Sequence, residues 1–411
     1  MTGILKTTWR FTRISEVCKV ESGRRPSGKE VYDTGYFSLG GEHITNDHQV
    51  NYNKNNWFIT EKFWYSLRKG KLDVGATLLV KDGATIGKCA YFNPFKVKYI
   101  SSVNEHVYKI VSKSYICDNR FLYYSICSPG CQAQIRNCIT GSAQPGLNRS
   151  FLKVVKVPFP DLATQHKIAS ILSAYDDLIE NNNRRIKILE KMAQTIYNEW
   201  FITFRFPGYK KVKMVDLELR KIPEEWAVKK VEEIVERIHP GKLYNSNTVR
   251  KSGKIPVLDQ GRSGIIGYHN DEPGVKASEN NPIIVFANHT CYQNLILFPF
   301  SAIQNVLPFI PSKANSRNIF WLHWATKDLV RFNDYKGHWP EFMNKKLIVP
   351  PRYICDEFGE AVKPMRLQIY KLRQQDDTLC RTRDLLLPKL INGEIDMDEI
   401  DIKLHKEDKN G

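Results

Sequence analysis

Two stretches of the chain place apolar residues at alternating steps of four and three. This heptad spacing predicts two long helices, each with an apolar seam turned toward a partner helix, and at about 1.5 Å rise per residue each would be roughly 45–60 Å long. Aligning "LEKMAQTIYNEWF" with "LCRTRDLLLPKLI" brings the seams into register. An antiparallel two-helix coiled coil is the simplest interpretation, and a bundle is the alternative. The seams are Ile168, Leu172, Tyr175, Ile179, Asn182, Ile186, Leu189, Ala193, Ile196 and Trp200, and then Met365, Ile369, Leu372, Asp376, Leu379, Arg383, Leu386 and Leu390.

Three seam positions are polar, namely Asn182, Asp376 and Arg383. A buried polar seam residue costs stability but fixes register and pairing. The alternative is that these side chains lie where the seam opens to water.

The remaining sequence reads as short, aromatic-rich strands separated by Gly, Asn and Pro, and it repeats. "WRFTRISEV", which begins at Trp9, matches "WAVKKVEEI", which begins at Trp226, and each is followed by glycine and basic residues, "SGRR" and "PGK". Each half then closes on a basic-aliphatic stretch ending in proline, "KVVKVPFP" and "KKLIVPP", just before a long helix.

This pattern predicts an α+β fold with two β-rich domains in tandem repeat and an approximate two-fold relation. We expect the first domain over 1–160 and the second over 206–352. The helices are expected over 161–205 and 353–393, followed by a charged, flexible tail over 394–411.

Charge changes the picture more than the rest of the composition does. The chain has 61 Lys and Arg against 44 Asp and Glu, which gives a net charge of +17. Such a surplus favours a polyanionic partner such as nucleic acid, although a basic surface without a partner is the alternative. No apolar run has the length of a signal peptide or membrane span, so we expect no membrane association.

The nine cysteines have scattered spacings and fit a reducing cytoplasm. The cluster of Cys117, Cys127, Cys131 and Cys138 lacks the C-x2-C spacing and paired histidines of a zinc site, so buried thiols and no metal are expected.

The sequence contains no recognisable catalytic motif. It lacks the [ND]-P-P-[FY] loop with which methyltransferases hold a flipped base, and it lacks H-E-x-x-H and serine-elbow patterns. The nearest matches to a nuclease triplet, "DIK" and "EDK", lie in the C-terminal tail. We therefore expect no catalysis and no cofactor on this chain itself.

The stretch "KDGATIGKCAYF" invites comparison with a phosphate-binding loop. Only three residues separate Gly83 from Gly87, and Cys89 stands where a hydroxyl would be needed. We predict instead a tight turn between two strands, with both glycines meeting backbone demands. Lys81 and Lys88 would then face phosphate or simply water.

Several segments together resemble the specificity subunit of type I restriction–modification systems over nearly the full length. They are "LDVGATLLVKDGATIGKCAYF", in which Ala76 stands where the family usually has Asp, "TGSAQPGLNRSFLKVVKVPFPDLATQHKIASILSAYDDLI", "LRQQDDTLCRTRDLLLPKLINGEI", "IPVLDQGRSGIIGYHND" and "PIIVFANHTCYQNLILFPF".

The resemblance implies that each β-rich domain is a target-recognition domain that reads half of a bipartite sequence in double-stranded DNA. The helices would set the spacer between the half-sites and dock two modification subunits that use S-adenosylmethionine. Two restriction subunits would add ATP- and Mg-dependent translocation and cleavage. The alternatives are a related methylation-only or type II-like system, and a coiled-coil scaffold that binds no DNA.

Base readout requires forked donors and acceptors on loops. The candidates in the two halves are Arg24, Arg25, Ser142, Gln144 and Asn148, and then Gln260, Arg262, Asn288, His289, Arg317 and His338. Candidates for positioning on phosphates are Lys54, Lys81, Lys88, Lys242 and Lys336. For docking on the helices, the candidates are apolar residues off the seam, which could equally contact the chain's own domains: Ile171, Leu178, Ile188, Met192 and Tyr197.

Overall fold

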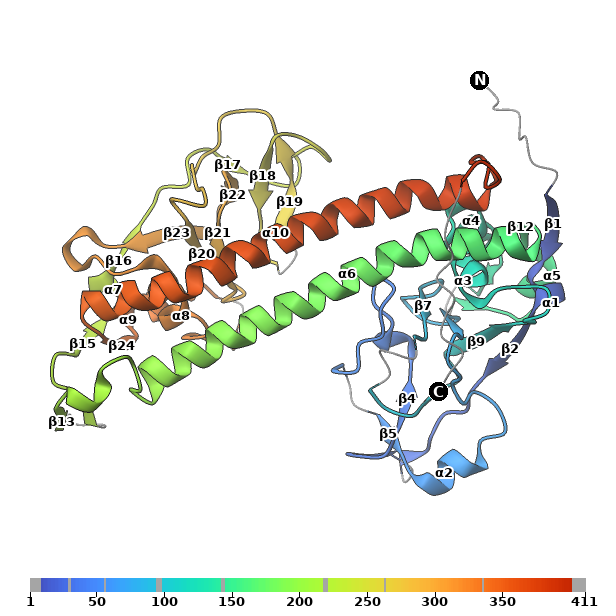
Figure 1. Cartoon of the computed structure of the whole chain (residues 1–411), viewed down its shortest axis with the longest axis horizontal. Coiled ribbons are helices and arrows are strands. Elements are labelled where there is room, and N and C mark those ends of the chain that lie inside the picture. Colours follow the sequence, from blue (N-terminus) through green and yellow to red (C-terminus); the bar gives the residue numbers. More distant parts are fainter. Residues whose placement is uncertain are drawn as a thin grey trace. The chain divides into compact units, whose positions relative to one another are not determined.

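The computed structural model has the α+β architecture expected from the sequence (Figure 1). It describes residues 9–28, 31–54, 57–93, 98–141, 145–216, 221–261, 264–334 and 336–400. The chain divides into two compact units. Unit 1 comprises Met1–Glu180 together with Asp376–Gly411, and unit 2 comprises Asn181–Gln375.

The described residues of unit 1 form two four-stranded sheets and two two-stranded sheets. The first four-stranded sheet has the order β2-β9-β6-β7 and the second has the order β3-β5-β4-β8, while the two-stranded sheets pair β1 with β12 and β10 with β11. The elements are β1 (Arg10–Arg13), α1 (Ile14–Val17), β2 (Cys18–Ser22), β3 (Val31–Tyr32), β4 (Tyr36–Leu39), β5 (Phe58–Ile59), α2 (Glu61–Ser66), β6 (Thr77–Val80), β7 (Cys89–Tyr91), β8 (Ser101–Val103), β9 (Val107–Ser112), α3 (Asn119–Cys127), α4 (Pro129–Asn137), β10 (Ile139–Thr140), β11 (Gly146–Leu147), α5 (Phe151–Val154) and β12 (Lys156–Phe159).

Unit 2 repeats the first four-stranded sheet and the β1-β12 pair strand for strand, as β16-β23-β20-β21 and β15-β24. Its second four-stranded sheet has a different order, β17-β22-β18-β19, and β13 pairs with β14 in a further two-stranded sheet. The elements are β13 (Met214–Asp216), β14 (Lys221–Pro223), β15 (Ala227–Lys230), α7 (Val231–Ile234), β16 (Val235–Arg237), β17 (Leu243–Tyr244), β18 (Ile255–Leu258), β19 (Ile265–His269), β20 (Ile283–Ala287), β21 (Gln293–Ile296), β22 (Ser301–Ile303), β23 (Val306–Pro311), α8 (Ile319–Thr326), α9 (Trp339–Asn344) and β24 (Lys346–Val349).

The repeat in the sequence is also a repeat of structure. "WRFTRISEV" forms β1 and α1, and "WAVKKVEEI" forms β15 and α7. In each unit the following strand joins a four-stranded sheet whose inner strand, β6 or β20, is buried along its whole length. Such continuous apolar runs, "TLLV" and "IIVFA", are typical of strands covered on both faces.

Two long helices complete the fold, α6 (Leu162–Tyr197) and α10 (Arg352–Ile391). Asp161 accepts hydrogen bonds from the backbone N–H and the hydroxyl of Thr164 at the start of α6, which satisfies donors that every helix N-terminus leaves open. A short π-helical turn, Asn198–Ile202, follows α6.

Within each unit, a part of α6 packs antiparallel against a part of α10. In unit 1 Ile168 and Leu172 share a core cluster with Leu390, and in unit 2 Ile186 shares one with Ile369 and Leu372. These seam residues are buried, as are Asn182 and Ala193. The other predicted seam residues are partly buried, namely Tyr175, Ile179, Leu189, Ile196, Trp200, Met365, Asp376, Leu379, Arg383 and Leu386.

The polar seam residue Arg383 lies inside unit 1 and is paired there. Its Nη1 donates to Asp176 Oδ1 at 2.6 Å, and the hydroxyl of Tyr124 on α3 donates to Asp176 Oδ2 at 2.6 Å. Burial alone would lower the pKa of Arg383, but the carboxylates of Asp176 and Asp384 raise it above its ordinary value. For Arg383, this pairing favours a register-fixing role over exposure to water.

The cysteines are free thiols; among the four of the suspected cluster, Cys117 and Cys131 are buried, and burial raises the pKa of both. The described residues contain no group of three or more His, Cys, Asp or Glu side chains placed to hold a metal ion. In the same part of the chain, no helix combines the length and apolar character needed to cross a membrane.

Candidate nucleic-acid interface

The predicted turn at "DGATIGK" joins the antiparallel strands β6 and β7. Gly83 and Gly87 have φ of 82° and 88°, a region that glycine enters without the steric cost of a Cβ. Gly87 N–H donates to the carbonyl of Val80 at 2.9 Å and closes the turn. A nucleotide-binding loop would instead lead from a strand into a helix, so the structure excludes that interpretation.

Three chain segments of unit 1 meet at this turn. The N–H of Lys81 donates to the carbonyl of His106, between β8 and β9, at 3.0 Å, and the carbonyl of Lys81 accepts from the N–H of Leu147 on β11 at 2.7 Å. The turn is thereby held between the β8–β9 loop and the segment that precedes α5.

Five titratable side chains lie next to one another at this meeting point. His106 lies between two carboxylates, with Nδ1 3.3 Å from Asp82 Oδ2 and Nε2 3.0 Å from Glu105 Oε1. Lys81 Nζ is 3.5 Å from the same Asp82 oxygen, and Arg25 Nε is 3.7 Å from Glu105 Oε1. We call these five residues the first corner; they offer donors and acceptors side by side, as base edges require.

Unit 2 builds the same corner with the same two backbone hydrogen bonds. The N–H of Asn288, after β20, donates to the carbonyl of Asn305 at 2.9 Å, and the carbonyl of Asn288 accepts from the N–H of His338 at 2.9 Å. Asn288 therefore occupies the position of Lys81. Its side-chain Oδ1 also accepts from the N–H of Trp339 at 2.8 Å, at the start of α9.

Three further candidates converge on Asn288. Gln260 Oε1 accepts from the N–H of His289 at 2.8 Å, and the Gln260 carbonyl accepts from the Thr290 hydroxyl at 2.6 Å. His289 Nδ1 lies 3.0 Å from the carbonyl of Lys336, which can only accept, so this nitrogen has the proton. We call Gln260, Asn288, His289, Asn305 and Lys336 the second corner.

The other candidates of unit 1 lie in different surroundings. Arg24 packs over the Phe63 ring and donates to Ser66, and Lys54 is exposed. Lys88 ends the turn and is half-buried, while Asn148 accepts from the N–H of Ser150 before α5. Ser142 and Gln144 lie outside the described residues.

In unit 2, Lys242 lies 2.9 Å from Asp271, and this hydrogen bond raises the pKa of Lys242 and lowers that of Asp271. Arg317 donates to the backbone carbonyls of Pro350 and Ser316. The side chain of His338 is fully buried, so only its backbone contributes to the corner. Arg262 lies outside the described residues.

Sequence reasoning did not select Asp82, Glu105, His106 or Asn305. Asp82 lies in the β6–β7 turn itself, whereas the other three lie in turns that become adjacent to the β6–β7 or β20–β21 turn only through strand pairing. The repeat contained one usable signal, since His106 and Asn305 both lie in the turn just before β9 or β23, the last strand of the corresponding four-stranded sheet in each half.

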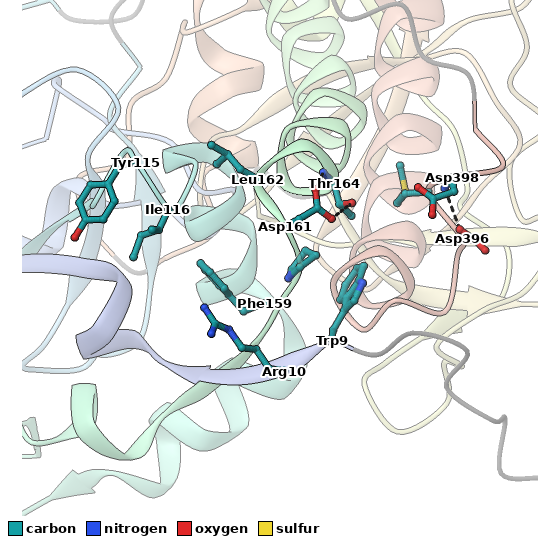
Figure 2. Close-up of a pocket in the computed structure, with 12 residues that line it drawn as sticks. Trp9, Arg10, Tyr115, Ile116, Phe159, Asp161, Leu162, Thr164, Asp396 and Asp398 are labelled. Atoms are coloured by element: carbon teal, nitrogen blue, oxygen red, sulfur yellow. Dashed lines mark hydrogen bonds between the residues drawn. The ribbon is translucent and has the colours of Figure 1, made fainter.

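A groove of about 740 Å³ lies elsewhere in unit 1 and is drawn in Figure 2. Trp9, Arg10 and Phe159 line one part of it, and the carboxylates of Asp161, Asp396 and Asp398 line another. Three carboxylates disfavour a phosphate there, so this groove is not part of the candidate interface.

The apolar candidates on α6 fall into two groups. Ile171 and Tyr197 pack against the cores of units 1 and 2, respectively. Leu178, Ile188 and Met192 are exposed.

Residues 6–191 match the protein family described as "Type I restriction modification DNA specificity domain". This match covers the β-rich part of unit 1 and most of α6, and so defines the class of the domain.

Whole-chain comparisons extend the relation. The chain is 26% identical to the "Type I restriction enzyme MjaIX specificity subunit" of Methanocaldococcus jannaschii, with 97% of this chain and 96% of that protein covered. It is 25% identical to the EcoR124I/EcoR124II specificity subunit of Escherichia coli over 29% of this chain and 30% of that protein. The crystal structure of a type I S subunit from M. genitalium shares the fold, with a TM-score of 0.59, 15% identity, and 95% and 98% of the two chains covered. Residues 6–191 thus match the type I specificity domain, and along nearly its full length the chain is similar to a specificity subunit of a type I restriction–modification system.

Proposed function

We propose that this chain is the DNA-recognition subunit of a type I restriction–modification system and that each unit reads one half of a bipartite site. The observation that supports this most directly is the pair of corners. One backbone frame presents Arg25, Lys81 and His106 in unit 1, but Gln260 and His289 in unit 2. A constant frame with different polar side chains suits two readers of different base sequences.

In this proposal the chain supplies recognition and its partners supply the chemistry. Two modification subunits, which use S-adenosylmethionine, would methylate adenine, and two restriction subunits, which use ATP and Mg, would join them where the system includes restriction. The assembled complex would then be an adenine-N6 DNA methyltransferase and a site-specific deoxyribonuclease. The proposed place of action is the cytoplasm.

The test is single-molecule sequencing of methylated adenine in a host that expresses this chain with and without its modification subunit. We expect a bipartite methylated motif only when both are present. His289→Ala should relax the motif in one half-site only, and His106→Ala should relax it in the other half-site. Loss of both half-sites in either variant would contradict separate readout.

Failure of the unaltered chain to bind any duplex, with its complex assembled, would instead favour the scaffold alternative. DNA binding and methylation with no restriction subunit in the complex would identify a methylation-only or type II-like relative.

We also propose that α6 and α10 set the spacer, because each helix contributes residues to both units. Removing one heptad from each helix, around residues 180 and 375, should shorten the unread spacer by about three base pairs, given about 34 Å for a turn of duplex and about 10 Å for seven helical residues. An unchanged spacer in the methylated motif would refute this role.

A further inference from the structure

A cluster of basic residues surrounds the short helix α2 on the surface of unit 1. The segment "EKFWYSLRKGK", residues 61–71, has four basic residues and a single acidic one. Arg24 joins them from the end of β2, because its guanidinium carbon lies 4.5 Å from the centre of the Phe63 ring and its Nη2 donates to the Ser66 hydroxyl at 3.1 Å. We call the cations of this cluster the basic ridge: Arg24, Lys62, Arg68, Lys69 and Lys71.

Aromatic rings hold two cations of the ridge in place. Besides Arg24 over Phe63, Lys71 Nζ lies 5.3 Å from the centre of the Trp64 ring and 5.8 Å from that of Tyr65. Trp64 in turn stacks on Tyr36, with ring centres 4.5 Å apart and an angle of 8° between the rings. A ring attracts a cation without neutralising its charge, as a carboxylate would. These side chains are therefore ordered before an anion arrives, which lowers the entropy cost of binding it.

The first corner differs from the ridge because its charges are balanced. Arg25 lies 3.7 Å from Glu105, and Lys81 lies 3.5 Å from Asp82. Two cations thus face two carboxylates, so the corner by itself adds little attraction for phosphates.

The ridge has no such balance. Within the part of the chain that the structure describes, none of its cations is in an ion pair, and the neighbouring carboxylates of Glu21 and Asp73 pair with Lys109 instead. Lys242 of unit 2 provides a contrast: it also lies over a ring, that of Tyr244 at 5.1 Å, but it is bonded to Asp271 at 2.9 Å. The ridge therefore presents positive charge that the protein itself does not neutralise.

Tight backbone packing joins the ridge to the first corner. Gly70 lies so close to Gly23 that a Cβ on Gly70 would be 2.7 Å from the Gly23 Cα. Gly23 N–H donates to the carbonyl of Asn104 at 3.2 Å, and the Gly70 carbonyl accepts from the N–H of Val103 at 2.8 Å. Asn104 directly precedes Glu105 of the corner. One packed surface therefore includes both the corner and the ridge.

We infer that the basic ridge binds the sugar–phosphate backbone of duplex DNA beside the half-site that the first corner reads. Such contacts position a protein on the duplex and supply affinity without sequence preference. Arg24 is thereby assigned to phosphate positioning and not to base readout. The inference rests on the proposed function for the identity of the DNA.

The state of the rings favours phosphate over unpaired bases as the ligand. A platform for unpaired bases needs an open aromatic face. Trp64 is stacked on Tyr36 and approached by Lys71, and Phe63 is buried. Tyr65 is 67% exposed, but a single ring beside five cations suits a backbone contact better than a stack of bases.

The experiment measures binding of the full chain, assembled with its modification subunit, to two duplexes, one with the methylated motif and one with that motif scrambled. Arg24→Gln combined with Lys71→Gln should lower the slope of log K against log[salt] by about 1.8, because each lost phosphate contact removes about 0.9. At about 0.15 M salt this corresponds to about 30-fold weaker binding of both duplexes, with the methylated motif unchanged.

Two further variants guard against effects on folding and on total charge. Lys62→Gln combined with Lys69→Gln changes two exposed side chains of the ridge and should also weaken both duplexes equally. The matched control is Arg13→Gln combined with Lys153→Gln, which removes the same charge from exposed positions on β1 and α5. Figure 1 shows these elements at the end of unit 1 away from α2, so the control should leave the slope unchanged.

Unchanged affinity and slope in both ridge variants, while the unaltered complex binds DNA, would overturn the inference and leave the proposed function intact. A methylated motif relaxed by Arg24→Gln would return Arg24 to base readout and overturn it too. Weaker binding of single strands but not of duplexes, or of the modification subunit but not of DNA, would assign the ridge to a different ligand. If the unaltered complex bound no duplex, the proposed function itself would fail.

Discussion

The ion pair between Arg383 and Asp176 gives a direct test of how the two long helices are held in register within unit 1. Asp176 accepts two hydrogen bonds of 2.6 Å, from Arg383 Nη1 and from the Tyr124 hydroxyl. The side chains of Arg383 and Asp176 are only 15% and 22% exposed. Replacing Asp176 by Leu removes the acceptor of the Tyr124 hydroxyl and one of the two carboxylates that pair with Arg383, which keeps only its bond to the more exposed Asp384.

Each hydrogen bond to a charged group contributes about 1.5–3 kcal/mol. Loss of both predicts a cost of about 3–6 kcal/mol, close to the range of about 3–5 kcal/mol for breaking one side of a buried ion pair. Adding Arg383→Met to Asp176→Leu removes the partly buried cation that has lost its inner partner, so the double variant should recover part of the loss.

Hydrogen exchange of the full chain is the appropriate measurement, because a chain with two units has no single unfolding free energy. Peptides from 162–180 and 376–391 report on unit 1. The matched control is the pair of Arg373 and Glu190 in unit 2, with a separation of 3.0 Å but exposures of 46% and 45%; Glu190→Leu should cost below about 1 kcal/mol. If Asp176→Leu and Glu190→Leu lowered the free energy of opening equally, burial of the Arg383–Asp176 pair would not explain how the register is fixed.

Three further predictions concern local structure. Burial lowers the pKa of His323 well below 6.5, so the side chain stays neutral in the folded state, whereas the unfolded chain binds a proton. The unfolding free energy of unit 2 should therefore fall as the pH drops below 6.5. His323→Gln should weaken this dependence, as measured by urea titrations at about pH 7.5 and about pH 5.5. Gly87→Ala should lower the melting temperature, because a φ of 88° costs a residue with a Cβ about 1–2 kcal/mol of strain. Gly130→Ala should raise it, because Gly130 lies in α4 with open space around it and alanine favours a helix by about 1 kcal/mol over glycine. Hydrogen bonds from Thr164 lower the pKa of Asp161, so Asp161→Ala should lower the stability of the start of α6 by about 1 kcal/mol near neutral pH. This difference should shrink as the pH falls through the folded-state pKa of Asp161. Hydrogen exchange at the start of α6 measures it.

The features that could be predicted from the sequence are those with local causes. The heptad spacing indicated α6 and α10 because an apolar stripe repeats with the helix itself. Gly83 and Gly87 indicated a turn because few other residues adopt positive φ. The repeat that begins at Trp9 and Trp226 predicted two similar β-rich halves, and the matching sheets β2-β9-β6-β7 and β16-β23-β20-β21 confirm it.

The features that could not be predicted depend on distant strand pairing. His106 reaches Asp82 only because β9 pairs with β6, and no spacing in the chain announces that contact. Burial was also invisible from the sequence: His338 and Arg317 looked like other polar loop residues, yet His338 is enclosed and Arg317 is bound to two backbone carbonyls.

The composition of unit 1 from two separated stretches, residues 1–180 and 376–411, has a consequence for biosynthesis. A ribosome makes all of unit 2 before it makes the last segment of unit 1. Until then Ile168 and Leu172 lack Leu390 and Met397, with which they share a core cluster. Unit 2 can therefore begin to fold first during translation. Unit 1 exposes part of its apolar core until the last turns of α10 are made. During this interval the nascent chain is most prone to aggregation and most accessible to chaperones.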